Sequence, residues 1–184
     1  MTNDPRFLAC LPCTLIQECP LPNDWSNRRN FSNDAHDPGG ATMCGIIQRE
    51  YDIFRKSKGL PTRAVIQLEQ AEGYEIYQTS YWLPDCPKLP AGLDLCLFDE
   101  SVNAGPHEAT KILQVALGIP ADGSWGPQTD AAITGITDVA AVINAYTARR
   151  EAFYRSLRGF QYFGADWIRR SAEIGAQAIK MVGS

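Results

Sequence analysis

The segment Asn33-Asp34-Ala35-His36-Asp37-Pro38-Gly39-Gly40-Ala41-Thr42-Met43-Cys44-Gly45-Ile46 carries the strongest local signals in the chain. At its centre, Asp37-Pro38-Gly39-Gly40 is typical of a tight turn, because proline presets φ and glycine accepts positive φ. The Asp37 carboxylate and the Thr42 hydroxyl flank this turn, and a helical pattern begins at Ile46. We therefore expect a short β-hairpin around the glycines and a helix directly after it.

A single acidic residue, Glu18, lies upstream of this segment near the end of a mostly apolar run. Asp4-Pro5 is typical of an N-cap followed by the first helical residue, which predicts a helix over roughly residues 5–18. The dipole at a helix C-terminus disfavours the charged form of a carboxylate such as Glu18. A carboxylic acid, a second carboxylate and a hydroxyl are the groups that split a glycosidic bond with water. The alternative is that Glu18 is a solvated surface residue.

Hydrophobic periodicity predicts helices through the rest of the chain, with little or no sheet. They are expected over residues 46–58, 68–81, 93–104, 107–117, from 127, 138–157 and 164–182. The predicted fold class is therefore mainly α.

Composition bounds the function. A chain of 184 residues with 45% hydrophobic residues is one domain, or one domain with a small appendage. Its net charge of −4 gives no electrostatic footprint for nucleic acid. No apolar run is long enough for a membrane span, and no signal peptide precedes the first helix. We therefore expect synthesis in the cytoplasm without an export signal of its own, no membrane insertion and a monomer.

Six cysteines raise the question of a metal site or of disulfides. Cys10 and Cys13 form one Cys-x-x-Cys, but no second such pair and no histidine cluster accompanies it. A zinc site is therefore not expected, and neither a metal nor another cofactor is predicted. Packed free thiols are the preferred interpretation, although an oxidising compartment would leave disulfides open.

The pattern Asp-Pro-Gly-Gly-Ala-Thr-x-x-Gly-Ile of residues 37–46 resembles the signature of the glycoside hydrolase 108 muramidases, which are phage and bacterial endolysins. The resemblance implies a lysozyme-like helical bundle with at most a short β-hairpin. It also implies hydrolysis of the β-1,4 bond between N-acetylmuramic acid and N-acetylglucosamine in peptidoglycan. By the same resemblance Glu18 is the general acid, and Asp37 and Thr42 position the attacking water. Their order is similar to the Glu-Asp-Thr triad of phage-T4-type lysozymes.

The sequence departs from the family pattern after the acid. The family has Glu-Gly-Gly-Tyr shortly before the glycine turn, whereas Glu18 precedes Cys19-Pro20 and lies further upstream. An ungapped match would put Arg28 at the acid's position, and a guanidinium cannot donate a proton. We interpret residues 19–29 as containing an insertion and retain Glu18.

Simpler roles exist for the other two residues. Asp37 has the alternative of capping its own turn, and Thr42 that of capping the following helix. Asp34 is the second candidate for the carboxylate, and His36 is expected to be an exposed turn residue.

Two further segments are similar to the family. Phe98 to Gly105 resembles Phe-Asp-x-x-Val-Asn-x-Gly, in which Asp99 and Asn103 share one helix face and are candidates for substrate binding. The alternative is a polar network that braces the helices. The Tyr81-Trp82 pair is a candidate for stacking on a sugar ring, with core packing as the alternative.

The segment Asp122 to Thr129 resembles the Asp-Gly-x-x-Gly-Pro-x-Thr repeat of peptidoglycan-binding modules. It either binds wall polymer or only completes the fold. We expect a catalytic lysozyme-like lobe over residues 1–105 and a peptidoglycan-binding-like helical part over 106–184, or one compact domain formed by both. The resemblance implies bacterial peptidoglycan as partner, action on the periplasmic cell wall, and delivery through a holin or on a phage virion.

Two other functions remain open. One is a cell-wall-binding or virion structural protein whose hydrolase site has decayed, which the altered residues after Glu18 would favour. The other is a lytic transglycosylase, which needs one glutamate but no activated water. The presence of both Asp37 and Thr42 argues against the transglycosylase.

Overall fold

A computed structural model describes residues 4–33 and 40–183 of the chain. The chain divides into two compact units, Met1–Ser80 and Tyr81–Ser184, of which each is described by itself. Eight α-helices and one small sheet occur in the described residues, so the predicted mainly α fold is confirmed. Within those residues, no helix combines the length and the apolar character that a membrane span requires.

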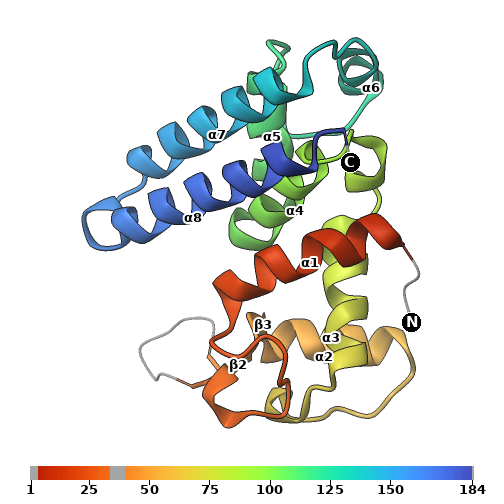
Figure 1. Ribbon diagram of the computed structural model, residues 1–184. Coiled ribbons are helices and arrows are strands. Elements are labelled where there is room, and N and C mark those ends of the chain that lie inside the picture. The colour runs from red at the N-terminus through yellow and green to blue at the C-terminus, as the bar shows by residue number, and fades with distance from the viewer. Residues whose placement is uncertain (1–3, 34–39, 184) are drawn as a thin grey trace. The chain divides into compact units, whose positions relative to one another are not determined.

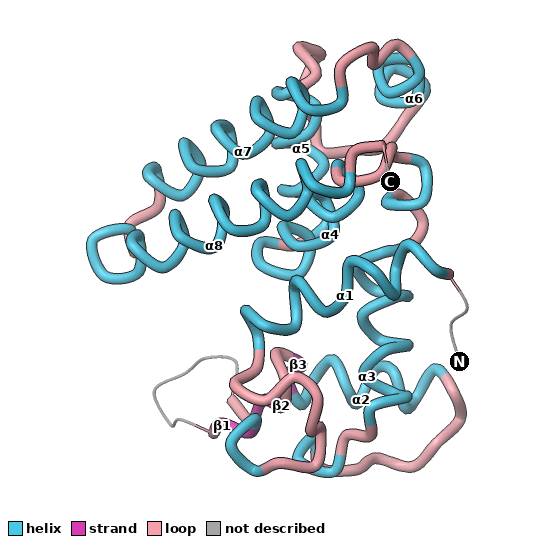
Figure 2. Tube along the Cα trace, in the orientation of Figure 1, coloured by secondary structure: helices cyan, strands magenta, loops and turns pink. Residues whose placement is uncertain are grey.

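The first unit contains three α-helices and a three-stranded antiparallel sheet (Figure 1). In chain order these elements are α1 (Pro5–Glu18), β1 (Phe31–Ser32), β2 (Thr42–Met43), β3 (Ile46–Ile47), α2 (Gln48–Ser57) and α3 (Gln70–Tyr77). Each strand has two residues, and the sheet order is β1-β2-β3 (Figure 2). The helix predicted from Ile46 therefore starts later, since Ile46–Ile47 is a strand and α2 begins at Gln48.

Helix α1 has the predicted bounds for the predicted reason. The Asp4 carboxylate accepts hydrogen bonds from the backbone N–H groups of Arg6 and Phe7, which caps the free N-terminal donors. Pro5 occupies the first turn, where its missing N–H costs nothing. The buried side chains of α1 include Phe7, Leu11 and Leu15, so one face of the helix is in the core.

A buried polar network joins α2 to α3. The Tyr51 hydroxyl donates to Glu72 Oε2 at 2.6 Å, and Arg55 Nη1 donates to Glu72 Oε1 at 2.6 Å. Arg63 also forms an ion pair with Glu72. The pairing satisfies a carboxylate that burial would otherwise destabilise. These bonds fix α3, and with it Tyr77, relative to α2.

The second unit is a helical bundle of α4 (Leu93–Ala104), α5 (Pro106–Ala116), α6 (Pro127–Thr134), α7 (Val139–Ser156) and α8 (Phe160–Met181). Helices α7 and α8 lie side by side and antiparallel (Figure 1). Helix α4 packs against α5, α7 and α8, and every residue from Leu93 to Ser101 is buried. Because α4 is buried on all sides, its acidic residues need partners within the bundle.

Candidate active site

Glu18 is the last residue of α1 and is half-buried. It lies against the backbone of Gly45, since a β-carbon on residue 45 would stand 2.8 Å from Glu18 Oε2 and 3.1 Å from Glu18 Cβ. The same β-carbon would stand 2.8 Å from the Tyr77 hydroxyl oxygen. The end of α1, the Gly45 backbone and the end of α3 therefore bring a carboxylate and a phenol to one point.

Gly45 occupies a two-residue turn between β2 and β3. Met43 pairs with Ile46, and the two residues between them, Cys44 and Gly45, have φ values of 47° and 74°. Two consecutive positive φ values are the requirement of the type I′ hairpin turn, which suits the twist of the strands. Tyr77 donates its hydroxyl hydrogen to the Cys44 carbonyl at 2.8 Å, so α3 holds this turn from outside the hairpin.

Thr42 is half-buried in β2, where it pairs with Ser32 of β1 and Ile47 of β3. Its hydroxyl donates to the Gly40 carbonyl at 3.1 Å. It does not cap a helix, because the next helix starts only at Gln48. Thr42 therefore lies in the same hairpin as the Cys44–Gly45 turn that contacts Glu18.

The other candidates in this segment cannot be placed. Asp37, the predicted water-positioning carboxylate, lies outside the described residues, as do Asp34 and His36. The residues on either side of this segment, Ser32 of β1 and Thr42 of β2, pair in an antiparallel arrangement.

The segment after Glu18, interpreted above as an insertion, is a packed loop. Asn30 is buried, and its side chain bonds to both the N–H and the carbonyl of Leu21 at 2.9 Å and to the Asp24 carbonyl at 2.9 Å. Trp25 is 5% exposed and packs edge-on against Tyr74, with ring centroids 5.8 Å apart. Arg28, the residue that an ungapped alignment would make the acid, is exposed.

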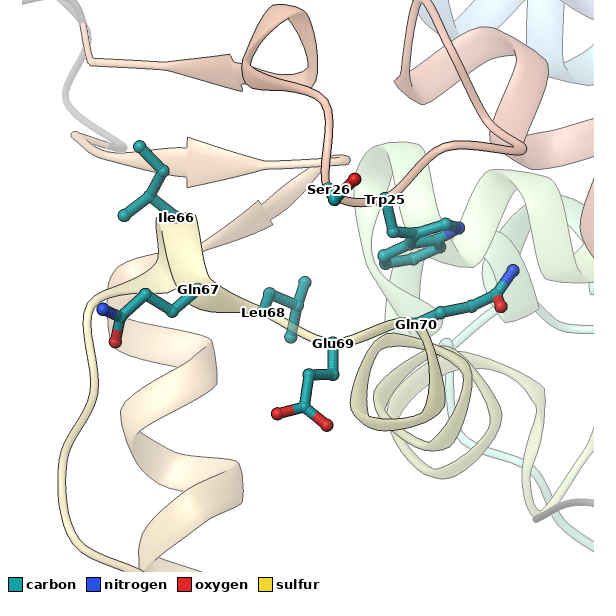
Figure 3. Close-up of a pocket in the computed structure, with 7 residues that line it drawn as sticks. All are labelled: Trp25, Ser26, Ile66, Gln67, Leu68, Glu69 and Gln70. Carbon is teal, nitrogen blue, oxygen red and sulfur yellow. The ribbon is translucent and has the colours of Figure 1, made fainter.

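Gly73 makes room for Trp25, because a β-carbon at residue 73 would lie 2.1 Å from the indole ring. The same loop borders a cavity of about 420 Å³ in the first unit (Figure 3). The cavity is lined by Trp25, Ser26, Ile66, Gln67, Leu68, Glu69 and Gln70. It contains none of the residues predicted to act in catalysis or binding.

Asp99 lies in the centre of the second unit. It is fully buried, and its two carboxylate oxygens accept hydrogen bonds from Arg150 Nη2 at 2.6 Å and from Arg170 Nε and Nη2 at 3.0 Å each. Burial alone would raise the pKa of Asp99, but the two guanidinium groups outweigh it and hold the pKa below its usual range. These contacts fit the alternative given above for Asp99, in which it belongs to a polar network that braces the helices.

Asn103 is half-buried and donates from Nδ2 to the Tyr154 hydroxyl at 2.8 Å. Tyr154 also accepts from Arg150 Nε at 2.7 Å and donates to Glu100 at 2.5 Å. Burial raises the pKa of the Glu100 carboxyl, and Arg150 only partly offsets that effect. Asn103 therefore belongs to the same network as Asp99, and a role for either residue in substrate binding stays a prediction.

The Tyr81-Trp82 pair divides between two environments. Trp82 is fully buried and packs edge-on against Phe98 at 5.6 Å between ring centroids, which is the core-packing alternative. Tyr81 is half-buried. Stacking on a sugar ring stays a prediction for this pair, and the geometry favours Tyr81 over Trp82.

The segment from Asp122 to Thr129 is organised by one buried side chain, that of Gln114. Its amide donates to Asp122 Oδ1 and to the Ser124 carbonyl at 3.0 Å each, and it accepts from the Gly123 N–H at 2.8 Å. Gly123 has φ 74°, and a β-carbon there would lie 2.6 Å from the His107 ring. The glycine is thus required by both the turn and its packing, so completing the fold is a sufficient role for this motif.

Sequence reasoning missed two residues that lie close to Glu18, Gly45 and Tyr77. Gly45 was used only as a position of the family pattern, directly before a predicted helix, and Tyr77 only as one of several aromatic residues at helical spacing. A local signal existed for Gly45, since a glycine between Thr42-Met43 and Ile46-Ile47 fits a two-residue hairpin turn. No local signal existed for Tyr77, because its contact spans distant parts of the sequence.

Comparison with known proteins gives the family. The model of the family Glycosyl hydrolase 108 matches residues 29–105, a segment that contains Thr42 and Gly45 but begins after Glu18. The solved structure entitled "Structure of Brucella abortus SagA" is similar over 97% of this chain and 96% of that chain, with a TM-score of 0.79 and 26% sequence identity. No curated protein sequence matches the chain significantly. Residues 29–105 thus match the glycosyl hydrolase 108 family, and this match together with the structural similarity supports a glycoside hydrolase.

Proposed function

We propose that the protein is a peptidoglycan hydrolase that cleaves the β-1,4 bond between N-acetylmuramic acid and N-acetylglucosamine. Peptidoglycan is the substrate class that fits the matched family. The observation that carries the proposal is the position of Glu18, a half-buried carboxyl held against the Gly45 turn and the Tyr77 hydroxyl.

In this proposal Glu18 is the general acid. A glycosidase acid must give a proton to the leaving oxygen, so its environment has to favour the protonated form. A rigid position also matters, because proton transfer needs hydrogen-bonding distance to the leaving oxygen. The hairpin turn and the end of α3 supply that rigidity.

Asp37 and Thr42 are proposed to orient the attacking water. An inverting hydrolase needs roughly 6.5–9.5 Å between its acid and its base to leave space for that water. Thr42 precedes Cys44 by two positions on the hairpin, which is about 7 Å at the rise of a β-strand. Thr42 therefore lies on the same hairpin as the Gly45 turn but away from its tip, and Asp37 precedes Thr42 by five positions in the sequence.

The test is the chemical structure of the product. Purified peptidoglycan would be digested with the protein, and the soluble fragments analysed by mass spectrometry before and after borohydride reduction. The proposal predicts fragments that end in reducible N-acetylmuramic acid and contain one added water. Anhydro ends that resist reduction would instead establish a lytic transglycosylase, and reducible N-acetylglucosamine ends would establish cleavage of the other glycosidic bond.

Delivery and location are also proposals. Action on a periplasmic wall would require release through a holin or transport on a virion, if the enzyme acts as a phage endolysin. Fractionation of cells that express the protein with and without a holin would test the first route. Wall lysis that needs the holin would support it, and lysis without the holin would contradict it.

A further inference from the structure

Two cysteines lie directly beside the Glu18–Gly45 contact. Cys19 follows Glu18 at the end of α1, and Cys44 precedes Gly45 in the hairpin turn. Both are buried, with 3% of Cys19 and none of Cys44 exposed, and the Cys19 thiol donates to the Leu15 carbonyl at 3.4 Å. The two side chains are close enough for each to be the main influence on the other's pKa. The close approach of Glu18 Cβ to the Gly45 backbone shows independently that these two pieces of chain run against each other.

The pair is chemically asymmetric. The hydrogen bond that the Cys44 thiol donates lowers the pKa of Cys19, and this effect outweighs burial and the nearby Glu18 charge. The same hydrogen bond, together with burial, raises the pKa of Cys44 well above its usual range. A lowered pKa favours the thiolate form of Cys19, and the thiolate is the nucleophile in thiol–disulfide exchange.

The other cysteines differ from this pair. The Cys96 thiol is fully buried, and burial raises its pKa to about 12, so it is a packed and unreactive group. Cys13 is half-exposed on α1, with its thiol directed at the Ala9 carbonyl of the same helix at 4.0 Å. Cys13 supplies the control for the experiment below.

We propose that Cys19 and Cys44 form a disulfide when the chain folds in the presence of a disulfide oxidant, either a small molecule or a protein. The Cys19 thiolate attacks one oxidant sulfur and releases one thiol, which leaves a mixed disulfide. Cys44 then loses its proton, attacks the Cys19 sulfur and releases the second thiol. Two cysteine thiols are oxidised by two electrons in total, and one oxidant disulfide is reduced to two thiols.

Burial determines when this step takes place. A bulky oxidant cannot reach sulfur atoms that are almost fully covered, so oxidation accompanies folding of the segment between Cys19 and Cys44. Once formed, the bond is shielded from reductants for the same reason. It links the end of α1 covalently to the hairpin turn, and it does not depend on which glycosidic bond the enzyme cleaves.

The test is refolding of the full chain from denaturant in a mixture of reduced and oxidised glutathione, followed by trapping of free thiols with N-ethylmaleimide. Trypsin then gives one peptide from Phe7 to Arg28, with Cys10, Cys13 and Cys19, and one from Asn30 to Arg49, with Cys44. Fragmentation of the linked pair identifies the cysteine that takes part. The proposal predicts that mass spectrometry finds these two peptides linked, and that they separate on reduction. C13S should give the same link, whereas C19S and C44S should abolish it.

A second readout is thermal stability. A disulfide between Cys19 and Cys44 closes the chain between them into a loop, which restrains the unfolded protein. Oxidised wild type should melt roughly 5–10 °C above the reduced form, and this difference should vanish in C44S but persist in C13S. The proposal is overturned if Cys19 and Cys44 are both recovered as maleimide adducts after refolding. It is equally overturned if Cys19 links to another cysteine, or if the oxidised form melts at or below the temperature of the reduced form.

Discussion

Glu18 and Gly45 are matched to each other: Glu18 Oε2 occupies the space in which a side chain at residue 45 would begin, 2.8 Å from the position of its β-carbon. Only glycine lets the hairpin turn approach the end of α1 this closely. The backbone at residue 45 also has φ 74°, which glycine adopts without strain. Gly45 thus meets two requirements at once: it leaves space for Glu18, and it adopts the positive φ of the turn. Both requirements affect the position of Glu18, the proposed acid.

Replacement of Gly45 by alanine should therefore move Glu18 and reduce wall clearance. The unfavourable φ alone costs about 1–2 kcal/mol, and the contact with Glu18 and Tyr77 adds to that cost. Gly59→Ala is the matched control, because Gly59 has φ 67° with no atom within 4 Å of its β-carbon position. Urea unfolding and turbidity loss of purified peptidoglycan would be measured for both. If the two variants lost the same free energy of unfolding and cleared peptidoglycan at the same rate, the contact at Gly45 would have no influence on Glu18.

Thr42→Val keeps the β-branched shape that suits β2 but removes the hydroxyl that donates to the Gly40 carbonyl. If the hydroxyl positions water, clearance should fall by about 10-fold or more, a little over 1.4 kcal/mol of transition-state stabilisation. Thr42→Ser, which retains the hydroxyl, should recover most of the rate. Circular dichroism and thermal melting would verify that all three proteins fold. A valine variant as active as wild type would remove Thr42 from the mechanism.

Gly73→Ala should destabilise the protein although the position is helical. At a solvent-exposed helix position, alanine is more favourable than glycine by roughly 0.5–1 kcal/mol. Here the new methyl would lie 2.1 Å from the Trp25 ring, so either α3 or the loop after Glu18 has to move. We expect a net loss of about 1–3 kcal/mol in the free energy of unfolding. In a Trp25→Phe background, which shortens the ring at that contact, the same change should cost less. A stabilising Gly73→Ala in wild type would contradict the packing described for Trp25.

Asp99 should make stability depend on acid pH. Its pKa is lowered in the folded protein, so it contributes stability above the pKa of the unfolded chain, about 3.9, and this contribution is lost as pH falls through the lower folded value. Asp99→Asn should cost roughly 3–5 kcal/mol near neutral pH, because it removes a buried carboxylate that pairs with both Arg150 and Arg170. The cost should shrink below pH 4. Asp166→Asn, at an exposed carboxylate, is the control. Urea titrations across this pH range would measure both variants.

The helices were predictable where local signals agree. Asp4-Pro5 and Pro20 bound α1, and Gly92 and Gly105 bound α4, so hydrophobic spacing between them was enough. Ile46–Ile47 was assigned to a helix because two adjacent isoleucines fit either period. The turn before Ile46 was not predicted because it contains Cys44, and a cysteine rarely adopts positive φ.

The candidate site was predictable in its residue types but not in its contacts. The end of α1 identified Glu18, yet its position beside the Gly45 turn and near the Tyr77 hydroxyl depends on packing between distant parts of the first unit. Asp99 and Asn103 do share the face that their spacing predicts. That face is directed into the bundle, because α7 and α8 supply Arg150, Tyr154 and Arg170 as partners. A pattern on one helix cannot reveal charges that another helix provides.

The most direct test of the account is the rate at which Glu18→Gln clears purified peptidoglycan, compared with wild type and with the exposed Glu173→Gln as control. Gln keeps the size of Glu18 but cannot donate its proton. With folding verified by circular dichroism, we expect Glu18→Gln to lose at least about 100-fold in rate, and the control to match wild type. A folded Glu18→Gln protein that clears the wall as fast as wild type would show that another group is the general acid and would contradict the account.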